Sequence, residues 1–134
     1  MARHFAKVLG GKVLKVIVAD PDFFNSFVDD SPGDWIETDY DTRGNVHYGT
    51  VDGEYKPDGG TPLRKNYAWP WHIYDVDKDA FYTNQPFPSW TLNNTTCHWE
   101  APLAEPTNPE LFYWDEEAYQ ADNTKGWVSN DKWF

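Results

Sequence analysis

Cysteine is nearly absent from this sequence, and long apolar runs are missing altogether. The single cysteine, Cys97, excludes a disulfide within the chain. No stretch approaches the roughly 18 apolar residues that a membrane-spanning helix needs. The opening residues, MARHFAKVLGG, lack the apolar segment of a secretory signal. We therefore expect a chain that is made and folded in a cytoplasm.

Basic residues are also scarce. The chain has 11 Lys and Arg residues against 22 Asp and Glu residues, which gives a formal net charge of −11. Because phosphate groups are bound by clustered Lys and Arg, nucleic acid and anionic membrane surfaces are poor partners for this chain. The acidity fits either of two roles: it keeps the protein soluble, or it forms a surface that docks on a basic partner.

What the sequence does contain is aromatic rings. Trp, Tyr and Phe occur 8 times each and make up 18% of the 134 residues, within a hydrophobic total of 40%. A chain of this length forms one domain, or two very small ones. Since each large ring buries about 150–250 Å², we expect aromatic clusters rather than a broad aliphatic core to hold the fold together.

Residues 1–40 are predicted to form a β-β-α unit followed by a third strand at Trp35–Tyr40. His4–Leu9 and Lys12–Ala19 are typical of strands, and Gly10-Gly11 between them suits a tight type I′ turn. The second strand has apolar residues on both faces, so we expect it to be buried on both sides.

A short helix is predicted after this hairpin. Asp20-Pro21 is a helix-start signal, a capping carboxylate followed by proline at the first helical position. Four apolar residues follow at helical spacing and would pack on the hairpin: Phe23, Phe24, Phe27 and Val28.

Residues 41–68 are predicted to be a long irregular loop. A connection of this length is unusual in a compact domain, so we expect it to be functional or ordered by a partner. Its turn signals are Arg43-Gly44-Asn45, Asp52-Gly53, Pro57-Asp58-Gly59-Gly60 and Thr61-Pro62.

Residues 69–134 are predicted to form tandem β-hairpins separated by proline-rich joints. Each has a short aromatic strand, a polar turn, and a second strand that carries Phe or Trp. The strand pairs are His72–Tyr74 with Ala80–Tyr82, Trp90–Leu92 with Cys97–Trp99, and Leu111–Trp114 with Gly126–Val128. A lone hairpin is marginal in water, so these must pack on each other, on the N-terminal unit or on a partner. The expected fold class is mainly β, with α+β character at the N-terminus, in one compact or extended domain.

No residue pattern indicates a metal site. Asp75, Asp77 and Asp79 alternate as at the start of a calcium-binding loop, but Ala80 and Pro86 stand where that loop needs Gly and Glu. We therefore interpret this segment as an acidic turn. The four histidines show no metal-ligand spacing.

Catalytic patterns are equally lacking. Cys97 and His98 are neighbours, and on a strand they would point to opposite faces, which argues against a Cys–His pair. Adjacent acids such as Glu116-Glu117 have no defined separation in a cleft. Gly10-Gly11 and Gly59-Gly60 lack the lysine or helix that follows a phosphate-binding loop. We expect a non-enzymatic binding or structural protein that needs no cofactor.

The aromatic residues are the candidate partner-binding residues. Trp and Tyr are enriched at the energetic centres of protein interfaces, and their flat faces also suit stacking on sugars. Packing inside the fold competes for the same rings and is expected to take more than half of them. The candidates are Trp69, Trp71, Tyr74, Trp90, Trp99, Trp114, Trp127, Trp133 and Phe134, with Trp133-Phe134 as the best docking plug.

An ordered series of motifs resembles a class of small proteins encoded by tailed bacteriophages, especially marine ones. The resemblance covers nearly the whole chain and implies a protein of the phage particle. It lies in His4–Val8 with Val16–Ala19, Gly44–Gly49, Leu63–Ala68, Pro86–Leu92, Trp99–Pro102, and Tyr113–Glu116 with Trp127-Val128.

We therefore expect a virion structural protein, and specifically a capsid decoration or cement protein that binds and stabilises the head surface. Its expected partners are the major capsid protein or other virion proteins, with a homo-oligomer on the particle as a further option. Two alternatives stay open. One is a tail or tail-fibre component whose aromatic surface binds glycans or the host, and the other is a fibre-assembly chaperone absent from the finished particle.

Overall fold

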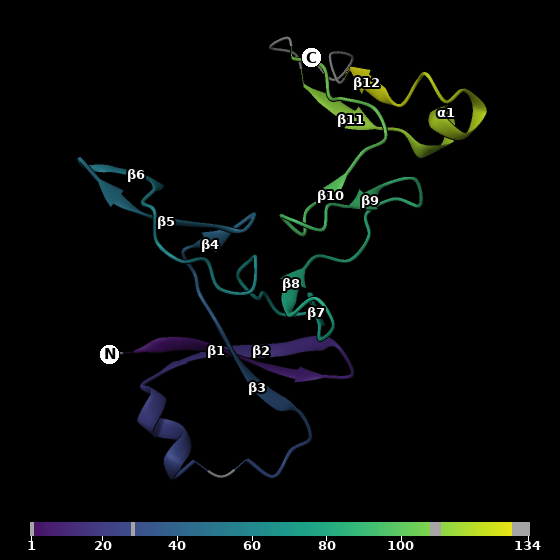
Figure 1. Ribbon diagram of the computed structural model, residues 1–134. Helices are drawn as coiled ribbons and strands as arrows, with labels where there is room; N and C mark the ends of the chain where they lie inside the picture. The colour runs from purple at the N-terminus through teal and green to yellow at the C-terminus, as the bar shows by residue number, and fades with distance from the viewer. Residues whose placement is uncertain (1, 28, 108–110, 130–134) are drawn as a thin grey trace. The chain divides into compact units, whose positions relative to one another are not determined.

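The described residues fold into short antiparallel strands with little helix, which confirms the expected mainly β class (Figure 1). The computed structural model describes residues 2–27, 29–107 and 111–129. Two compact units are present. The first comprises Met1–Asn84 and Asn93–His98, and the second comprises Gln85–Leu92 and Trp99–Phe134.

A five-stranded antiparallel sheet organises the first unit. Its strands are β1 (Arg3–Leu9), β2 (Lys12–Ala19), β3 (Asp34–Thr38), β7 (Ile73–Asp75) and β8 (Ala80–Tyr82), in the order β3-β1-β2-β7-β8. β1 therefore has a partner on each side. β7 pairs with β2 only opposite Lys12, so β7 and β8 extend the sheet at one end of β2.

The turn between β1 and β2 has the backbone of a type I′ hairpin. Gly10 and Gly11 both have positive φ angles, +58° and +77°, as this turn requires. Leu9 pairs with Lys12 across it. The register shifts once, between Lys7 and Val8, which marks a β-bulge in the pair.

β1, rather than β2, is the strand that is buried on both faces. Ala6 and Val8 lie in the main core with Val13, Ala68 and Phe81. On the opposite face of β1, Phe5 and Lys7 are also buried. The expectation for β2 was wrong because its position in the sheet leaves much of it at the edge: Lys15 and Val18 are exposed.

The segment after β2 forms a 3-10 helix, η1 (Pro21–Asn25), where an α-helix was expected. Asp20 makes no side-chain capping hydrogen bond, so its start lacks the stabilisation that the sequence signal suggested. The phenylalanines still pack together: Phe24 contacts the rings of Phe5 and Trp35 at centroid distances of 4.6 and 5.7 Å. Val28, predicted on the same face, lies outside the described residues.

The segment predicted as a long irregular loop contains a three-stranded antiparallel sheet instead. Its strands are β4 (Thr42–Arg43), β5 (Val46–Val51) and β6 (Glu54–Pro57). The prediction was wrong for residues 42–57 because two of the turn signals are hairpin turns: Gly44-Asn45 connects β4 to β5, and Asp52-Gly53, with φ angles of +53° and +80°, connects β5 to β6. Residues 58–68 contain no strand, as the loop prediction expected. The polar residues between the turns are strand residues on a small, largely exposed sheet.

The second unit contains two short strand pairs. They are β9 (Thr91–Leu92) with β10 (Trp99–Glu100), and β11 (Phe112–Trp114) with β12 (Trp127–Ser129). The polar stretch between β11 and β12 contains a helix that the sequence did not suggest, α1 (Glu116–Ala121). Asp115 caps it by accepting a hydrogen bond from the Ala118 N–H at 3.1 Å.

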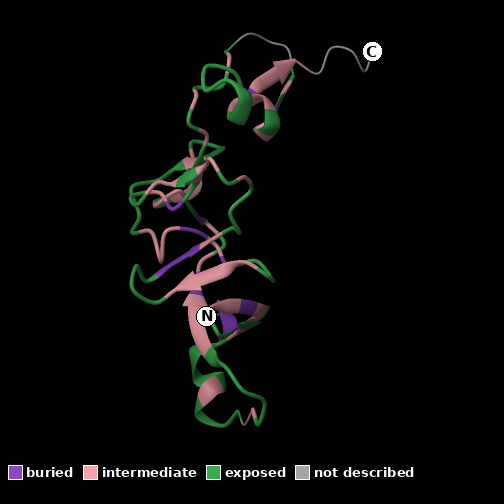
Figure 2. Ribbon diagram, turned by 90° about the vertical axis from the view of Figure 1, so that its right-hand side faces the viewer, coloured by how far each residue is buried: buried purple, intermediate pink, exposed green. Residues whose placement is uncertain are grey.

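Buried residues are few (Figure 2, purple), and exposed residues prevail in the turns and joints. Among the described residues, the buried hydrophobic ones are Phe5, Ala6, Val8, Val13, Ala68, Ala80, Phe81, Cys97 and Trp114. Three of these are alanines, so the interior of each unit is small. Much of the large apolar surface of the chain therefore stays in contact with solvent.

Candidate functional site

Four aromatic rings of the first unit form a connected group, called here the aromatic surface cluster: His4, Tyr40, Tyr67 and Trp69. Tyr67 is at its centre, with its ring centroid 5.0 Å from Trp69, 5.2 Å from Tyr40 and 5.4 Å from His4, all edge to face. The outer rings face solvent, since Tyr40 is 57% and Trp69 is 50% exposed. Edge-to-face packing therefore fixes a group of rings whose outer faces stay available.

Strand pairing brings these residues together from distant parts of the chain. His4 on β1 is opposite Thr38 at the end of β3, two residues before Tyr40. The buried Thr38 hydroxyl accepts a hydrogen bond from the Ala68 N–H at 2.9 Å. The Tyr67 N–H donates to the Thr42 carbonyl at 3.0 Å. The backbone on either side of Tyr67 is thus tied to β3 and β4, which preorganises the cluster.

The hydroxyl of the central ring, Tyr67, stays uncharged. Burial, with a smaller effect of nearby Tyr40, raises the pKa of the Tyr67 hydroxyl above its ordinary value of 10.0, so this group keeps its proton at physiological pH. Rings of this kind combine a large apolar face with a polar tip, which suits anchors in a protein interface or platforms for a sugar ring.

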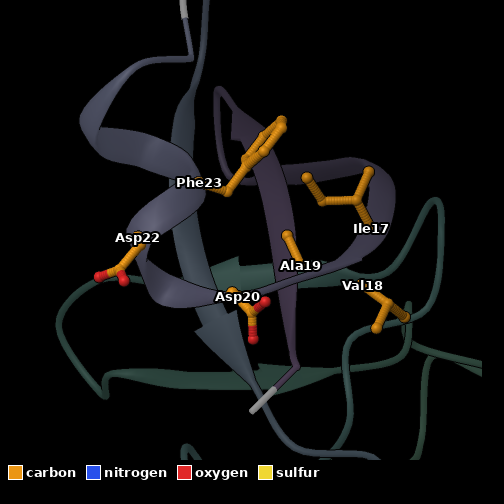
Figure 3. Close-up of a pocket in the computed structure, with 6 residues that line it drawn as sticks. All are labelled: Ile17, Val18, Ala19, Asp20, Asp22 and Phe23. Atoms are coloured by element: carbon orange, nitrogen blue, oxygen red, sulfur yellow. The ribbon is translucent and has the colours of Figure 1, made fainter.

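A second exposed apolar feature lies between the end of β2 and η1 (Figure 3). It is an open depression of about 600 Å³, and most of its lining surface is apolar. Phe23 and Val18 on its wall are 39% and 61% exposed. The side chains that line it are Ile17, Val18, Ala19, Asp20, Asp22 and Phe23. It widens the apolar surface of the first unit, with the carboxylates of Asp20 and Asp22 at its wall.

The predicted partner-binding residues of the first unit are divided between surface and core. Trp69 belongs to the aromatic surface cluster, and Trp71 is 65% exposed. Tyr74 instead packs against the buried Phe81 at 5.0 Å, and its hydroxyl donates to Asp79. Trp69 and Trp71 therefore remain candidates for partner binding, while Tyr74 mainly supports β7 and β8.

The predicted residues of the second unit pack largely on one another. Trp114 is buried, with its ring centroid 5.3 Å from Trp127 and 6.0 Å from Trp90. The Trp114 Nε1–H donates to Glu116 at 3.0 Å, and the Trp127 Nε1–H donates to the Leu103 carbonyl at 2.9 Å. These three tryptophans form the interior of the unit. They therefore have the internal packing role that the sequence analysis weighed against partner binding.

The remaining candidates are less informative. Trp99 lies on β10 and is partly buried. Trp133 and Phe134, the predicted docking plug, lie outside the described residues. Their partner binding stays a prediction.

The structure also brings together a group that sequence spacing did not suggest. Asp39, Asp41 and His47 each place one ligand-type atom within 4.8 Å of the others. A hydrogen bond of 2.8 Å joins His47 Nδ1 to Asp58, and this bond raises the pKa of His47 and lowers that of Asp58 relative to their ordinary values. The 39–41 pair is six residues or more from His47, so no short motif announced the contact.

Sequence reasoning also missed His4 and Tyr67 as cluster members. His4 sits in an alternating strand, where nothing marks it as an aromatic partner, and Tyr67 was assigned to an irregular loop. The proximity of both to Tyr40 depends on the pairing of β1 with β3 and on the Thr38 and Thr42 hydrogen bonds. The only sequence signal was the density of aromatics around residues 67–71.

Among the described residues, no helix has the length and apolar character that a membrane crossing demands. No protein-family model, curated protein or solved structure matches this chain.

Proposed function

We propose that this chain is a non-enzymatic structural protein of a bacteriophage particle, a capsid decoration protein that binds the head surface through the aromatic surface cluster. In this role the exposed rings of Tyr40 and Trp69 insert into a complementary surface of the major capsid protein or a neighbouring virion protein. The protein would stabilise the head by covering the junction between subunits, and it needs no cofactor to do so.

The exposure of large apolar side chains is the observation that carries this proposal. The described residues with large exposed hydrophobic side chains are Leu9, Val18, Phe23, Phe27, Tyr40, Val46, Tyr55, Trp69, Trp71, Val76, Leu111 and Tyr113. They outnumber the buried hydrophobic residues. Tyr40 and Trp69 of this set are adjacent in the aromatic surface cluster, and contiguous exposed apolar surface commonly marks a site of association. Tyr and Trp are also the residues that most often dominate such interfaces.

Two further features support the particle as the setting. The ordered motifs that resemble marine phage proteins span both units. The net charge of −11 favours a partner with a basic surface, because electrostatic attraction speeds association and selects partners.

Quantitative mass spectrometry of purified particles is the decisive experiment. We expect a copy number close to that of the major capsid protein, or one copy per capsomer. A count of a few to about a dozen would contradict decoration and place the chain in the tail, neck or fibres. Complete absence would contradict every virion role and leave the chaperone alternative.

A variant experiment tests the surface itself. Particles stripped of the chain would be titrated with the wild type and with a Tyr40→Ala/Trp69→Ala variant. Since both rings are half exposed, the variant should fold normally, and we expect its affinity to fall at least tenfold. Val76→Ala is the matched control, because Val76 is 75% exposed but lies in the turn between β7 and β8. Equal binding by all three proteins would contradict the assigned surface.

The same rings support a second candidate function, glycan binding by a tail or fibre component. The ring centroids of Tyr40 and Trp69 lie 6.3 Å apart with an interplanar angle of 65°. The two half-exposed rings are therefore neighbours that lie at an angle to each other. Aromatic faces in this arrangement can contact one sugar ring. A glycan array on which binding is saturable for the wild type and lost in Trp69→Ala would favour this function over decoration.

A further inference from the structure

Two carboxylates and one imidazole converge beside the β4-β5-β6 sheet. Asp39 and Asp41 lie between β3 and β4, and His47 lies on β5 opposite Thr42 of β4. The three donor atoms are all within 4.8 Å of one another, and His47 Nε2 is 3.3 Å from Asp39 Oδ2. All three residues are partly buried, so they are shielded from solvent more than a surface acidic patch would be.

The orientation of His47 is fixed from the other side of its ring. Nδ1 is 2.8 Å from Asp58 Oδ1, and that oxygen also accepts the Gly60 N–H at 2.9 Å. Because the carboxylate only accepts, Nδ1 carries the proton of this bond. Nε2, on the other side of the ring, lies 3.3 Å from Asp39 Oδ2, where a proton on Nε2 or a metal ion in its place would join the two groups. A carboxylate that orients histidine in this way is the usual outer partner of a metal-bound imidazole.

Each carboxylate of the group is also held by a donor from outside it. The buried Thr42 hydroxyl donates to Asp39 Oδ2 at 3.0 Å. The Tyr55 hydroxyl donates to Asp41 Oδ1 at 2.9 Å. All three prospective ligands therefore have a hydrogen-bonding partner that limits their rotation, which lowers the entropic cost of binding an ion.

Two glycines make room for the His47–Asp58 pair, and this is independent of the charges in the group. A Cβ at Gly60 would lie 2.6 Å from His47 Nδ1 and 3.0 Å from Asp58 Oδ1, and a Cβ at Gly49 would overlap the Asp58 carboxylate. Neither glycine has a positive φ angle, so backbone conformation does not require glycine there. Glycine is required there because a side chain would prevent the close approach of the Asp58 carboxylate to the His47 imidazole.

The distances suit a small divalent ion after a minor adjustment. Bonds of about 2.0–2.2 Å place neighbouring donors of a tetrahedral site about 3.4 Å apart, close to the separation of His47 Nε2 and Asp39 Oδ2. The third donor atom, on Asp41, lies within 4.8 Å of the other two. The imidazole disfavours Ca²⁺ and Mg²⁺, which prefer oxygen ligands alone, and favours first-row transition metals such as Zn²⁺.

We propose that Asp39, Asp41 and His47 form a binding site for a divalent first-row transition metal ion, with Asp58 positioning the imidazole. The ion joins the connection between β3 and β4 to β5. It thereby stabilises the three-stranded sheet, whose own buried surface is small. Asp39 and Asp41 flank Tyr40 of the aromatic surface cluster in the chain, so the two proposals are separated by their variants: His47→Gln removes a metal ligand, and Trp69→Ala removes an exposed ring.

The test uses the full chain, freed of metal by a chelator and titrated with Zn²⁺ in a calorimeter. We expect one saturable site and a higher melting temperature with the metal. His47→Gln and Asp39→Asn should weaken binding at least tenfold, and Asp58→Asn should weaken it about tenfold through loss of ring orientation. His72→Gln is the control, since His72 lies before β7 and outside the group, and it should bind like the wild type.

Histidine ¹⁵N NMR on the same samples identifies the ligand atom. Zn²⁺ should shift His47 Nε2 while Nδ1 keeps its proton, and the signals of His72 should not move. Circular dichroism would verify that each variant is folded. Three results would each overturn the proposal and leave only a histidine–carboxylate ion pair. They are absence of saturable binding, unchanged binding by His47→Gln, and a His47 ring that keeps a proton on Nε2 at saturating Zn²⁺.

Discussion

The side chains of Asn66 and His98 are hydrogen-bonded, with Asn66 Oδ1 2.9 Å from His98 Nε2. The same oxygen accepts the Gly44 N–H at 2.7 Å, so it is the amide oxygen and His98 Nε2 must donate. The Asn66 amide nitrogen donates to the carbonyls of Phe81 and Thr96, each at 3.0 Å. The Asn66 side chain thus joins its own segment to three other segments of the first unit.

Replacement of Asn66 by alanine should therefore destabilise the first unit strongly. The variant leaves the Gly44 N–H and the Phe81 carbonyl without their partner near the core, and each such group costs about 1–3 kcal/mol. We expect a loss of about 3 kcal/mol in the free energy of unfolding, measured by urea denaturation. Asn94→Ala, at an exposed residue, is the control. An equal stability of the two variants would show that the Asn66 network does not hold the unit together.

Asp29 should make the stability of the fold pH-dependent. Hydrogen bonds from the buried Lys7 and from Ser31 hold the pKa of the Asp29 carboxyl well below its usual range. A depressed pKa in the folded state stabilises the fold above the unfolded value of about 3.9. This contribution is lost as the pH falls from about 4 towards the folded pKa.

Denaturation curves between pH 6 and pH 2 measure this effect. Asp29→Asn should lower stability at pH 6 and flatten the profile below pH 4, because no charge partner of Lys7 remains to be protonated. Asp30→Asn, at the exposed neighbouring residue, should keep the wild-type slope. A wild-type slope in Asp29→Asn would refute the role of the pair.

Gly126→Ala should destabilise the second unit. The added Cβ would overlap the six-membered ring of the buried Trp114, whose Cζ2 would be 3.0 Å away. Overpacking of this kind costs about 1–3 kcal/mol, and tryptophan fluorescence during denaturation would report it. Lys125→Ala at the exposed neighbour should have little effect. If Trp114→Leu does not relieve part of the loss caused by Gly126→Ala, the clash is not the reason.

The β1–β2 turn offers a clean measure of backbone strain. At Gly10, φ is +58°, and an added Cβ would meet nothing within 4 Å. Gly10→Val should therefore cost about 1–2 kcal/mol from the left-handed conformation alone. Gly10→Asn should cost less, because asparagine tolerates this conformation. Thermal unfolding of both variants tests the order, and equal melting temperatures would contradict a type I′ turn.

Local patterns in the sequence predicted those elements that depend on neighbouring residues. Alternation with Gly10-Gly11 indicated the first strand pair, and short aromatic runs around polar turns indicated strands near Ile73–Tyr82 and Phe112–Ser129. The same logic failed for β4, β5 and β6. In the segment that contains these strands, residues typical of turns outnumber apolar residues. A series of hairpin turns and an irregular loop therefore have the same appearance in the sequence.

Features that depend on long-range contact had no sequence signal. His47 meets Asp39 and Asp58 only because β4 pairs with β5 and β5 with β6. Asn66 looks like an ordinary loop residue until the carbonyls around it are located in space. The abundance of aromatic residues predicted that rings would form the core and the candidate binding surface. Only the structure shows which rings are buried, such as Trp114, and which are exposed, such as Trp69.

The chain passes between its two units three times, because Asn93–His98 belongs to the first unit while the segments on either side belong to the second. A single proteolytic cut between Gln85 and Leu92 would therefore divide the polypeptide without freeing its C-terminal piece. That piece would keep Asn93–His98 inserted in the first unit, where Lys65 and Asn66 bind its carbonyls. The architecture is thus suited to fragment complementation: two separately made pieces, divided in this segment, have the contacts to reassemble without a covalent link.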